Sequence, residues 1–179
     1  KSIAPGNKYA APDQSVERST YFADMYNLAC AFSRTGQQDS ALKYLERFTI
    51  ESRDSVGEVL SDPDFINIRD AAGWSKLKDQ IIKCYCGKSK TTIKDIGYAK
   101  KLWRMGAIDQ AYYEDIDIAE RKTGKTSSVV MALWDLKRKQ NEENQQQLES
   151  LIKEKGWPKI SEVGPNLRTT AFLGIQHAN

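Results

Sequence analysis

Long hydrophobic runs are missing from this 179-residue chain, and no segment approaches the roughly 20 consecutive apolar residues that cross a bilayer. Cysteine is scarce as well. Of the three cysteines, Cys84 and Cys86 are too close together for an unstrained disulfide and lack a second pair that would complete a zinc site. We therefore expect no membrane span and no metal site, and we interpret Cys30 as a small core residue.

Histidine occurs once, as His177, so the chain has no set of histidines for a metal triad. It also lacks the G-x-S-x-G elbow of a serine nucleophile. The segment "CGKSKTT" at 86–92 resembles the end of a phosphate-binding loop, but Ile82 stands where the first glycine is required. We therefore predict neither nucleophilic catalysis nor a nucleotide or other cofactor, and we interpret 86–92 as a linker.

Charge of one sign is not in large excess, because the formal net charge is +3. Its distribution is uneven: residues 76–104 contain nine Lys or Arg and two Asp, whereas residues 109–120 contain five acids and no base. A basic stretch with interleaved aromatic residues could track an anionic polymer. A solvated helix surface explains the same pattern more simply, so a nucleic acid is not the partner that we expect.

The chain begins at Lys1, without a methionine, and residues 1–17 are expected to form an N-terminal tail. This start indicates that an upstream segment has been removed, which could be a signal peptide, a tag or part of a longer protein. A signal peptide would direct the protein to the periplasm or cell envelope. A tag or a longer protein would leave a cytoplasmic location open.

Apolar residues recur at three- and four-residue steps from about 18 to 34 and again from 38 to 48, which predicts two helices. Gly36 lies between them, so the pair should fold back as an antiparallel hairpin. The two apolar stripes consist of Tyr21, Phe22, Met25, Leu28, Ala29 and Phe32, and of Ala41, Leu42, Leu45 and Phe48. In these residues and in its glycine turn the segment resembles a tetratricopeptide repeat, although no proline closes it.

Residues 59–85 are helical in pattern but lack the small residues of such a repeat, and we interpret them as a degenerate follower. Pro63 is expected at a helix start and Gly73 at a break. The tetratricopeptide-like region would thus span 18–85. Stacked helical hairpins present concave surfaces, so our first hypothesis is a non-enzymatic module that binds a protein or peptide partner. The candidate contact residues are Tyr26 and Tyr44.

The rest of the chain, 92–179, predicts a second helical domain. Helical spacing runs from 93 to 121, and a long helix capped by Ser127 or Ser128 should extend to Lys155, where Gly156 and Pro158 end it. "KISEVGPN" is expected to be a turn-rich connection, and Asn166 to cap a last helix. No segment alternates polar and apolar residues long enough for a sheet. The predicted fold is all-α, with tetratricopeptide-like hairpins followed by a helical bundle.

From about residue 100 to 179 the sequence resembles a bacterial domain of unknown function. The residues that carry the resemblance are Asp109-Gln110, Asn144, Gly156-Trp157-Pro158, Val163-Gly164 and Gln176-His177-Ala178. It implies a fold and a set of positions rather than a reaction. Asn179 stands where an aspartate usually follows the alanine in that family.

Several of these residues are polar side chains at positions where the helical pattern faces a core. Imidazole side chains often serve in acid-base chemistry, so His177 is a candidate for that role. Alternatively, it packs as a hydrogen-bonded core residue beside Asp109, Gln110 or Asn144. Our second hypothesis is therefore a small-ligand-binding protein or an enzyme, whose site needs a pocket where these groups meet. The candidates are Asp109, Gln110, Asn144, Trp157, Gln176 and His177.

Overall fold

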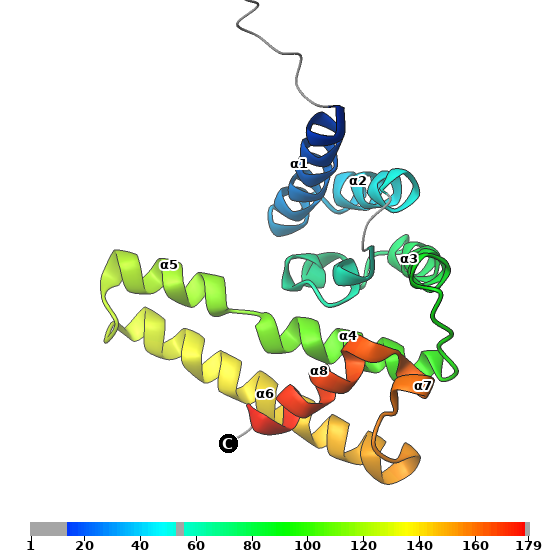
Figure 1. Cartoon of the computed structure of the whole chain (residues 1–179). Coiled ribbons are helices and arrows are strands. Elements are labelled where there is room, and N and C mark those ends of the chain that lie inside the picture. Colours follow the sequence, from blue (N-terminus) through cyan, green and yellow to red (C-terminus); the bar gives the residue numbers. More distant parts are fainter. Residues whose placement is uncertain (1–13, 53–55, 178–179) are drawn as a thin grey trace, which may run out of the picture.

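The computed structural model describes residues 14–52 and 56–177, and all regular structure in these ranges is helical, as predicted (Figure 1). None of the described helices combines the length and apolar content of a membrane span. In chain order the elements are α1 Gln14–Arg34, α2 Gln38–Glu51, the 3-10 helices η1 Val56–Leu60 and η2 Pro63–Ile68, α3 Trp74–Ser89, α4 Ile96–Gln110, α5 Tyr113–Thr123, α6 Ser128–Lys155, α7 Ile160–Val163 and α8 Pro165–Gln176.

The first two helices, α1 and α2, pack together as the expected hairpin. Gly36 ends the turn after α1 with a φ of +77°, which a residue without a Cβ adopts at little cost. Ala29 and Ala41 are fully buried, so they allow close packing of the helices. The predicted stripe is wrong at Tyr21 and Leu28, which are 41% and 44% exposed, because α1 buries only the part of the stripe that carries Met25 and Ala29. α1 also starts at Gln14, inside the expected tail, whose residues 1–13 lie outside the described ranges.

The region after α2 consists of two 3-10 helices and α3 rather than a second α-hairpin. Pro63 starts η2 as predicted, and the Asp62 side chain caps this helix by accepting a hydrogen bond from the Asp64 backbone N–H at 2.8 Å. Gly73 directly precedes α3, also as predicted. The linker expected at 86–92 is shorter, because α3 continues through Ser89.

The helix expected over 93–121 is interrupted at Tyr112, which has a left-handed φ of +71° and separates α4 from α5. Such a φ is uncommon for a bulky residue, so tertiary contacts must hold the break in place. The long helix is confirmed: Ser127 caps α6 and Gly156 follows its last residue. α7 forms a single turn inside the expected connection, and α8 starts at Pro165 with Gly164 rather than Asn166 as its N-cap.

In space, α6 runs alongside α5 and then α4, and α8 lies across α4 and α6 (Figure 1). One hydrophobic cluster extends from Met25 in α1 to Ala171 in α8, so the N-terminal and C-terminal regions share a core. On the surface, Arg34 at the end of α1 forms ion pairs with Asp64 in η2 and with Glu114 and Asp115 in α5. The domain boundaries at 85 and 92 stay predictions.

Candidate functional site

The site is built on the core-facing side of α6, which carries polar side chains in the middle of the helix. Its buried residues are Val130, Lys137, Asn144, Leu148 and Leu151. The first three are seven residues apart and so fall on one helical face. The middle of α6 therefore continues the apolar stripe with a lysine and an asparagine, which need hydrogen-bond partners because they are buried.

Asp109 in the last turn of α4 is the residue around which the polar groups gather. Its Oδ1 lies 2.8 Å from Nδ1 of His177, which directly follows α8, and its Oδ2 accepts a hydrogen bond from Nε2 of Gln110 at 2.7 Å. The Asp109 side chain is nearly buried, whereas that of His177 is about a third exposed. Because both carboxylate oxygens have partners, the orientation of Asp109 is fixed.

Lys137 is the residue of this group that sequence reasoning missed. Its Nζ donates to the backbone oxygen of Asp109 at 2.5 Å and lies 4.0 Å from the centroid of the Tyr113 ring. The lysine thus binds a carbonyl that α4 leaves unpaired at its C-terminus, next to the break at Tyr112. Burial lowers the pKa of Lys137, and the charge of Asp109 acts in the opposite direction.

Asn144 connects α6 to the middle of α4, because its Nδ2 donates to the backbone oxygen of Met105 at 3.1 Å. One turn earlier on α6, Asn141 donates to the backbone oxygen of His177 at 3.4 Å. Together with Lys137, these amides attach α6 to the end of α4 and to the end of α8. Together with the hydrogen bond between Asp109 and His177, these contacts join α4, α6 and α8, as the packing role considered for His177 requires.

A cavity of about 350 Å³ lies beside this cluster, between α4, α6 and α8. Its size falls within the range of small-molecule pockets. Apolar side chains contribute most of the wall, namely those of Leu102, Met105, Leu148 and Leu173. Five polar residues also line it: Ser61, Asp109, Gln110, Asn144 and Thr170.

The cavity thus contains three of the six predicted ligand-binding candidates. His177 contacts the site through Asp109 and is not among the residues that line the cavity. Gln176 is exposed, and Trp157 is 40% exposed after the end of α6. The six residues therefore do not converge on one pocket, because α8 ends beside Asp109 rather than over the cavity.

Tyr26 and Tyr44, the two candidates for partner binding, make internal contacts. The Tyr26 hydroxyl donates to Asp62, and its ring packs against Phe48 and Phe65 with centroids 5.2 and 5.6 Å away. Burial, followed by the hydrogen bond to Asp62, raises the pKa of Tyr26. The Tyr44 ring stacks on Phe32 at 5.4 Å and is half-buried. Tyr26 thus faces the core rather than an open groove.

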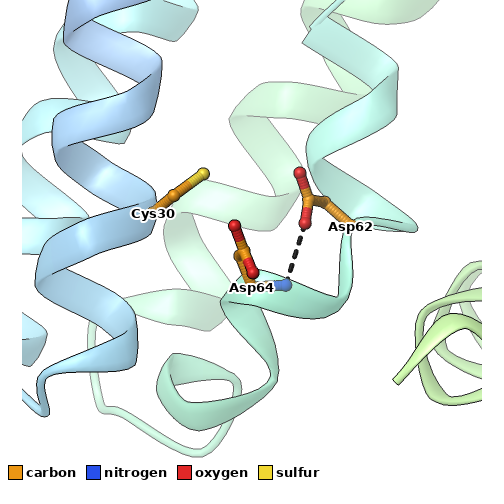
Figure 2. A group of neighbouring side chains, drawn as sticks. All are labelled: Cys30, Asp62 and Asp64. Atoms are coloured by element: carbon orange, nitrogen blue, oxygen red, sulfur yellow. Dashed lines mark hydrogen bonds between the residues drawn. The ribbon is translucent and has the colours of Figure 1, made fainter. Parts of the chain in front are cut away.

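Cys30 lies next to two carboxylates, and Figure 2 shows its thiol directed toward Asp62 and Asp64. One potential ligand atom from each of the three residues lies within 4.8 Å of the others, the one group of this kind among the described residues. The carboxylates already have partners, because Tyr26 donates to Asp62 and Arg34 pairs with Asp64. Burial and then the charge of Asp62 raise the pKa of the Cys30 thiol, so the protonated form, which is a poor metal ligand, is favoured.

The position of Cys30 differs from the apolar core position expected for it, since the residue is half-buried beside charged groups.

Comparison of this chain with protein-family models, curated proteins and solved structures found no match. The resemblances to a tetratricopeptide repeat and to a bacterial domain of unknown function therefore stay predictions.

Proposed function

We propose that the cavity between α4, α6 and α8 binds a small organic molecule with an apolar body and a head that donates hydrogen bonds. The position of Asp109 carries this proposal. Asp109 lines the cavity, and His177 and Gln110 hold its two carboxylate oxygens. A carboxylate that is already oriented loses little side-chain freedom when a ligand binds, which favours affinity.

The chemistry of the lining favours a donor on the ligand. The Asp109 carboxylate is an acceptor, and so is the side-chain carbonyl of Asn144, whose amide nitrogen donates to Met105. None of the described residues that line the cavity is a lysine or arginine. An anionic ligand would therefore meet the Asp109 carboxylate with no lysine or arginine in the lining, whereas an amine or hydroxyl would gain a charge-assisted hydrogen bond.

His177 acts as a positioning residue in this proposal, because it meets the cavity through Asp109. Its Nδ1 faces Asp109, and its Nε2 has no hydrogen-bond partner among the described residues. The proposed function is thus ligand binding without a catalytic step. It corresponds to the second hypothesis from the sequence, in its non-enzymatic form.

The test compares three ligands of equal length, hexylamine, hexanol and hexanoate, by ligand-observed NMR and calorimetry. We expect hexylamine to bind most tightly and hexanoate most weakly. Asp109→Asn should weaken hexylamine binding by about tenfold, since a hydrogen bond to a charged group contributes on the order of 1.5–3 kcal/mol. Asp135→Asn is the matched control, because Asp135 is exposed on α6 and pairs with Arg138. Leu173→Phe narrows the cavity and should weaken all three ligands.

Three results would overturn the proposal. The first is that no member of the series binds at millimolar concentration. The second is equal affinity for hexanoate and hexylamine, because the acceptor-rich lining would then have no influence. The third is equal loss of hexylamine affinity in Asp109→Asn and Asp135→Asn, which would indicate a general charge effect.

A protein or peptide partner, our first hypothesis, stays a prediction. The inward position of Tyr26 removes one of its two candidate contact residues from the surface. Tyr21 and Leu28 are exposed on α1, but scattered exposed apolar residues are normal on a protein surface and do not define a site. We therefore give the cavity priority.

A further inference from the structure

Arg69, which directly follows η2, is a half-buried cation that forms no ion pair with the carboxylates of residues 14–52 and 56–177. Its Nη2 donates to the backbone oxygens of Leu60 and Asp62 at 2.8 and 3.4 Å, and its guanidinium lies 5.2 Å from the ring centroid of the buried Trp74. Its Nε is buried and has no hydrogen-bond partner among the described residues. A buried donor without a partner is rare in folded proteins and requires an explanation.

A second arginine shares the surroundings of the first. Arg69 and Arg104 of α4 both line a cavity of about 140 Å³ between η2, α4 and α6. Neither guanidinium forms an ion pair with a carboxylate in the described part of the chain. Burial and then the charge of Arg104 lower the pKa of Arg69 to about 10, while the charge of Asp62 acts in the opposite direction without cancelling them.

Most of the other polar residues that line this cavity have side chains that can donate a hydrogen bond to an oxyanion. Tyr112 and Gln140 also line the cavity, and a tyrosine hydroxyl can donate a hydrogen bond. The amide nitrogen of Gln140 already donates to Glu143 at 3.1 Å, which leaves one of its two N–H groups for an anion. Asp70 is the one acidic residue that lines the cavity; it is exposed and forms no ion pair with either arginine. The left-handed backbone at Tyr112 places this residue at the joint between α4 and α5, where it lines the cavity.

We infer that this cavity is a binding site for a small oxyanion, such as phosphate, sulfate or the terminal carboxylate or phosphate group of a larger molecule. The anion would neutralise the repulsion between Arg69 and Arg104. Guanidinium groups bind such oxyanions through fixed, directional N–H donors, which favours this ligand class over a halide. The site is separate from the cavity beside Asp109, because it uses a different face of α4.

The experiment follows the arginine side chains of the full chain directly. Inorganic phosphate, sulfate and acetate are titrated at low ionic strength while the ¹⁵N–¹H signals of the arginine Nε groups are recorded. We expect phosphate to shift the Arg69 signal and the shift to saturate at one anion per chain. Comparison of the affinities for acetate and phosphate then shows whether the site prefers a planar or a tetrahedral oxyanion. Chloride at equal ionic strength is the reference.

Two exposed positions provide variants that should fold. Arg104→Gln should weaken phosphate binding by about tenfold, because a charge-assisted hydrogen bond is lost. Asp70→Asn should strengthen binding several-fold, because it removes the one negative charge from the lining. Arg121→Gln is the control, since Arg121 is exposed on α5 and pairs with Asp117. Arg69 itself is not replaced, because it also holds two backbone carbonyls.

The inference is overturned if none of the three anions shifts the Arg69 signal beyond the effect of chloride. It is also overturned if Arg104→Gln and Arg121→Gln lose affinity equally, which would indicate only a general attraction of anions to a basic protein. Opposite changes in Arg104→Gln and Asp70→Asn, with Arg121→Gln unchanged, would support it. None of these readouts depends on the ligand proposed for the other cavity.

Discussion

Asp109 and His177 are 68 residues apart in the sequence, and their side chains meet at 2.8 Å. A double-mutant cycle with Asp109→Asn and His177→Ala, measured by urea unfolding, should give a coupling energy of about 0.5–1.5 kcal/mol, because a part-buried hydrogen bond of this kind contributes that much. The cycle of His177→Ala with Asp135→Asn should give almost none. A coupling near zero for both pairs would contradict the contact.

Lys137→Met should lower the free energy of unfolding at neutral pH by about 1–3 kcal/mol, because the Asp109 carbonyl loses its donor and stays buried. Lys139→Met, on the exposed side of α6, should change it by less than about 0.5 kcal/mol. Urea unfolding of the three proteins measures both effects. A Lys137→Met protein more stable than the wild type would mean that burying the charge costs more than its hydrogen bond contributes.

The same variant predicts a pH effect with a definite sign. The pKa of Lys137 is lower in the folded protein than its ordinary value of 10.5. At pH values between the lowered pKa of the folded state and 10.5, the unfolded chain binds more protons than the folded protein. The free energy of unfolding of the wild type should therefore rise as the pH increases through this window. Unfolding curves recorded across this alkaline range should show the rise for the wild type and lack it for Lys137→Met.

Gly57→Ala and Gly87→Ala should change stability in opposite directions. A Cβ at Gly57 in η1 would lie 2.5 Å from Cδ2 of Tyr85, whose ring packs edge-on against Trp103, whereas a Cβ at Gly87 in α3 meets nothing within 4 Å. We expect Gly57→Ala to lower the free energy of unfolding by about 1–3 kcal/mol through overpacking. Gly87→Ala should raise it by up to about 1 kcal/mol, since alanine is the better helix former. Thermal unfolding of both variants tests the packing of α3 on η1.

The free energy of unfolding of the wild type should fall as the pH rises above 3.8, the ordinary pKa of the carboxyl group, and Asp64→Asn should remove this decrease. Burial and then the charge of Asp62 raise the pKa of Asp64 above its ordinary value of 3.8. Between 3.8 and the raised value the folded state binds more protons, so wild-type stability falls as the pH rises through this window. The free energy of unfolding of Asp64→Asn minus that of the wild type should therefore increase with pH in this window and be constant above it. Asp24→Asn, on an exposed part of α1, is the control, and equal curves for the two variants would contradict the prediction.

The local features of the fold could be predicted because they depend on residues close together in the sequence. Gly36 ends α1, Pro63 starts η2, and Ser127 and Gly156 bound α6, each through a backbone preference or a short-range hydrogen bond. The periodicity of apolar residues likewise indicated helices throughout. Where two such signals competed, as at Pro165 and Asn166, the predicted helix start was two residues off, since Gly164 rather than Asn166 is the N-cap.

The candidate site stays a prediction, but the structure places part of it in one region. All six candidates carry the resemblance to a bacterial domain of unknown function, and three of them, Asp109, Gln110 and Asn144, line one cavity. The side chains of Trp157 and Gln176 are exposed. Lys137 could have been found by continuing the seven-residue spacing of Val130 and Asn144, which marks it as a core-facing position inside a polar segment.

The sequence by itself determined the helical class, several helix ends and the single histidine available to the site, because these follow from residue type and local spacing. Tertiary structure decided the break at Tyr112, where a lysine from α6 binds the end of α4. It also decided that Tyr26 faces inward, and that Arg69 and Arg104, which are far apart in the sequence, line one cavity. These arrangements depend on which helix faces pack together, and no local pattern specifies that choice.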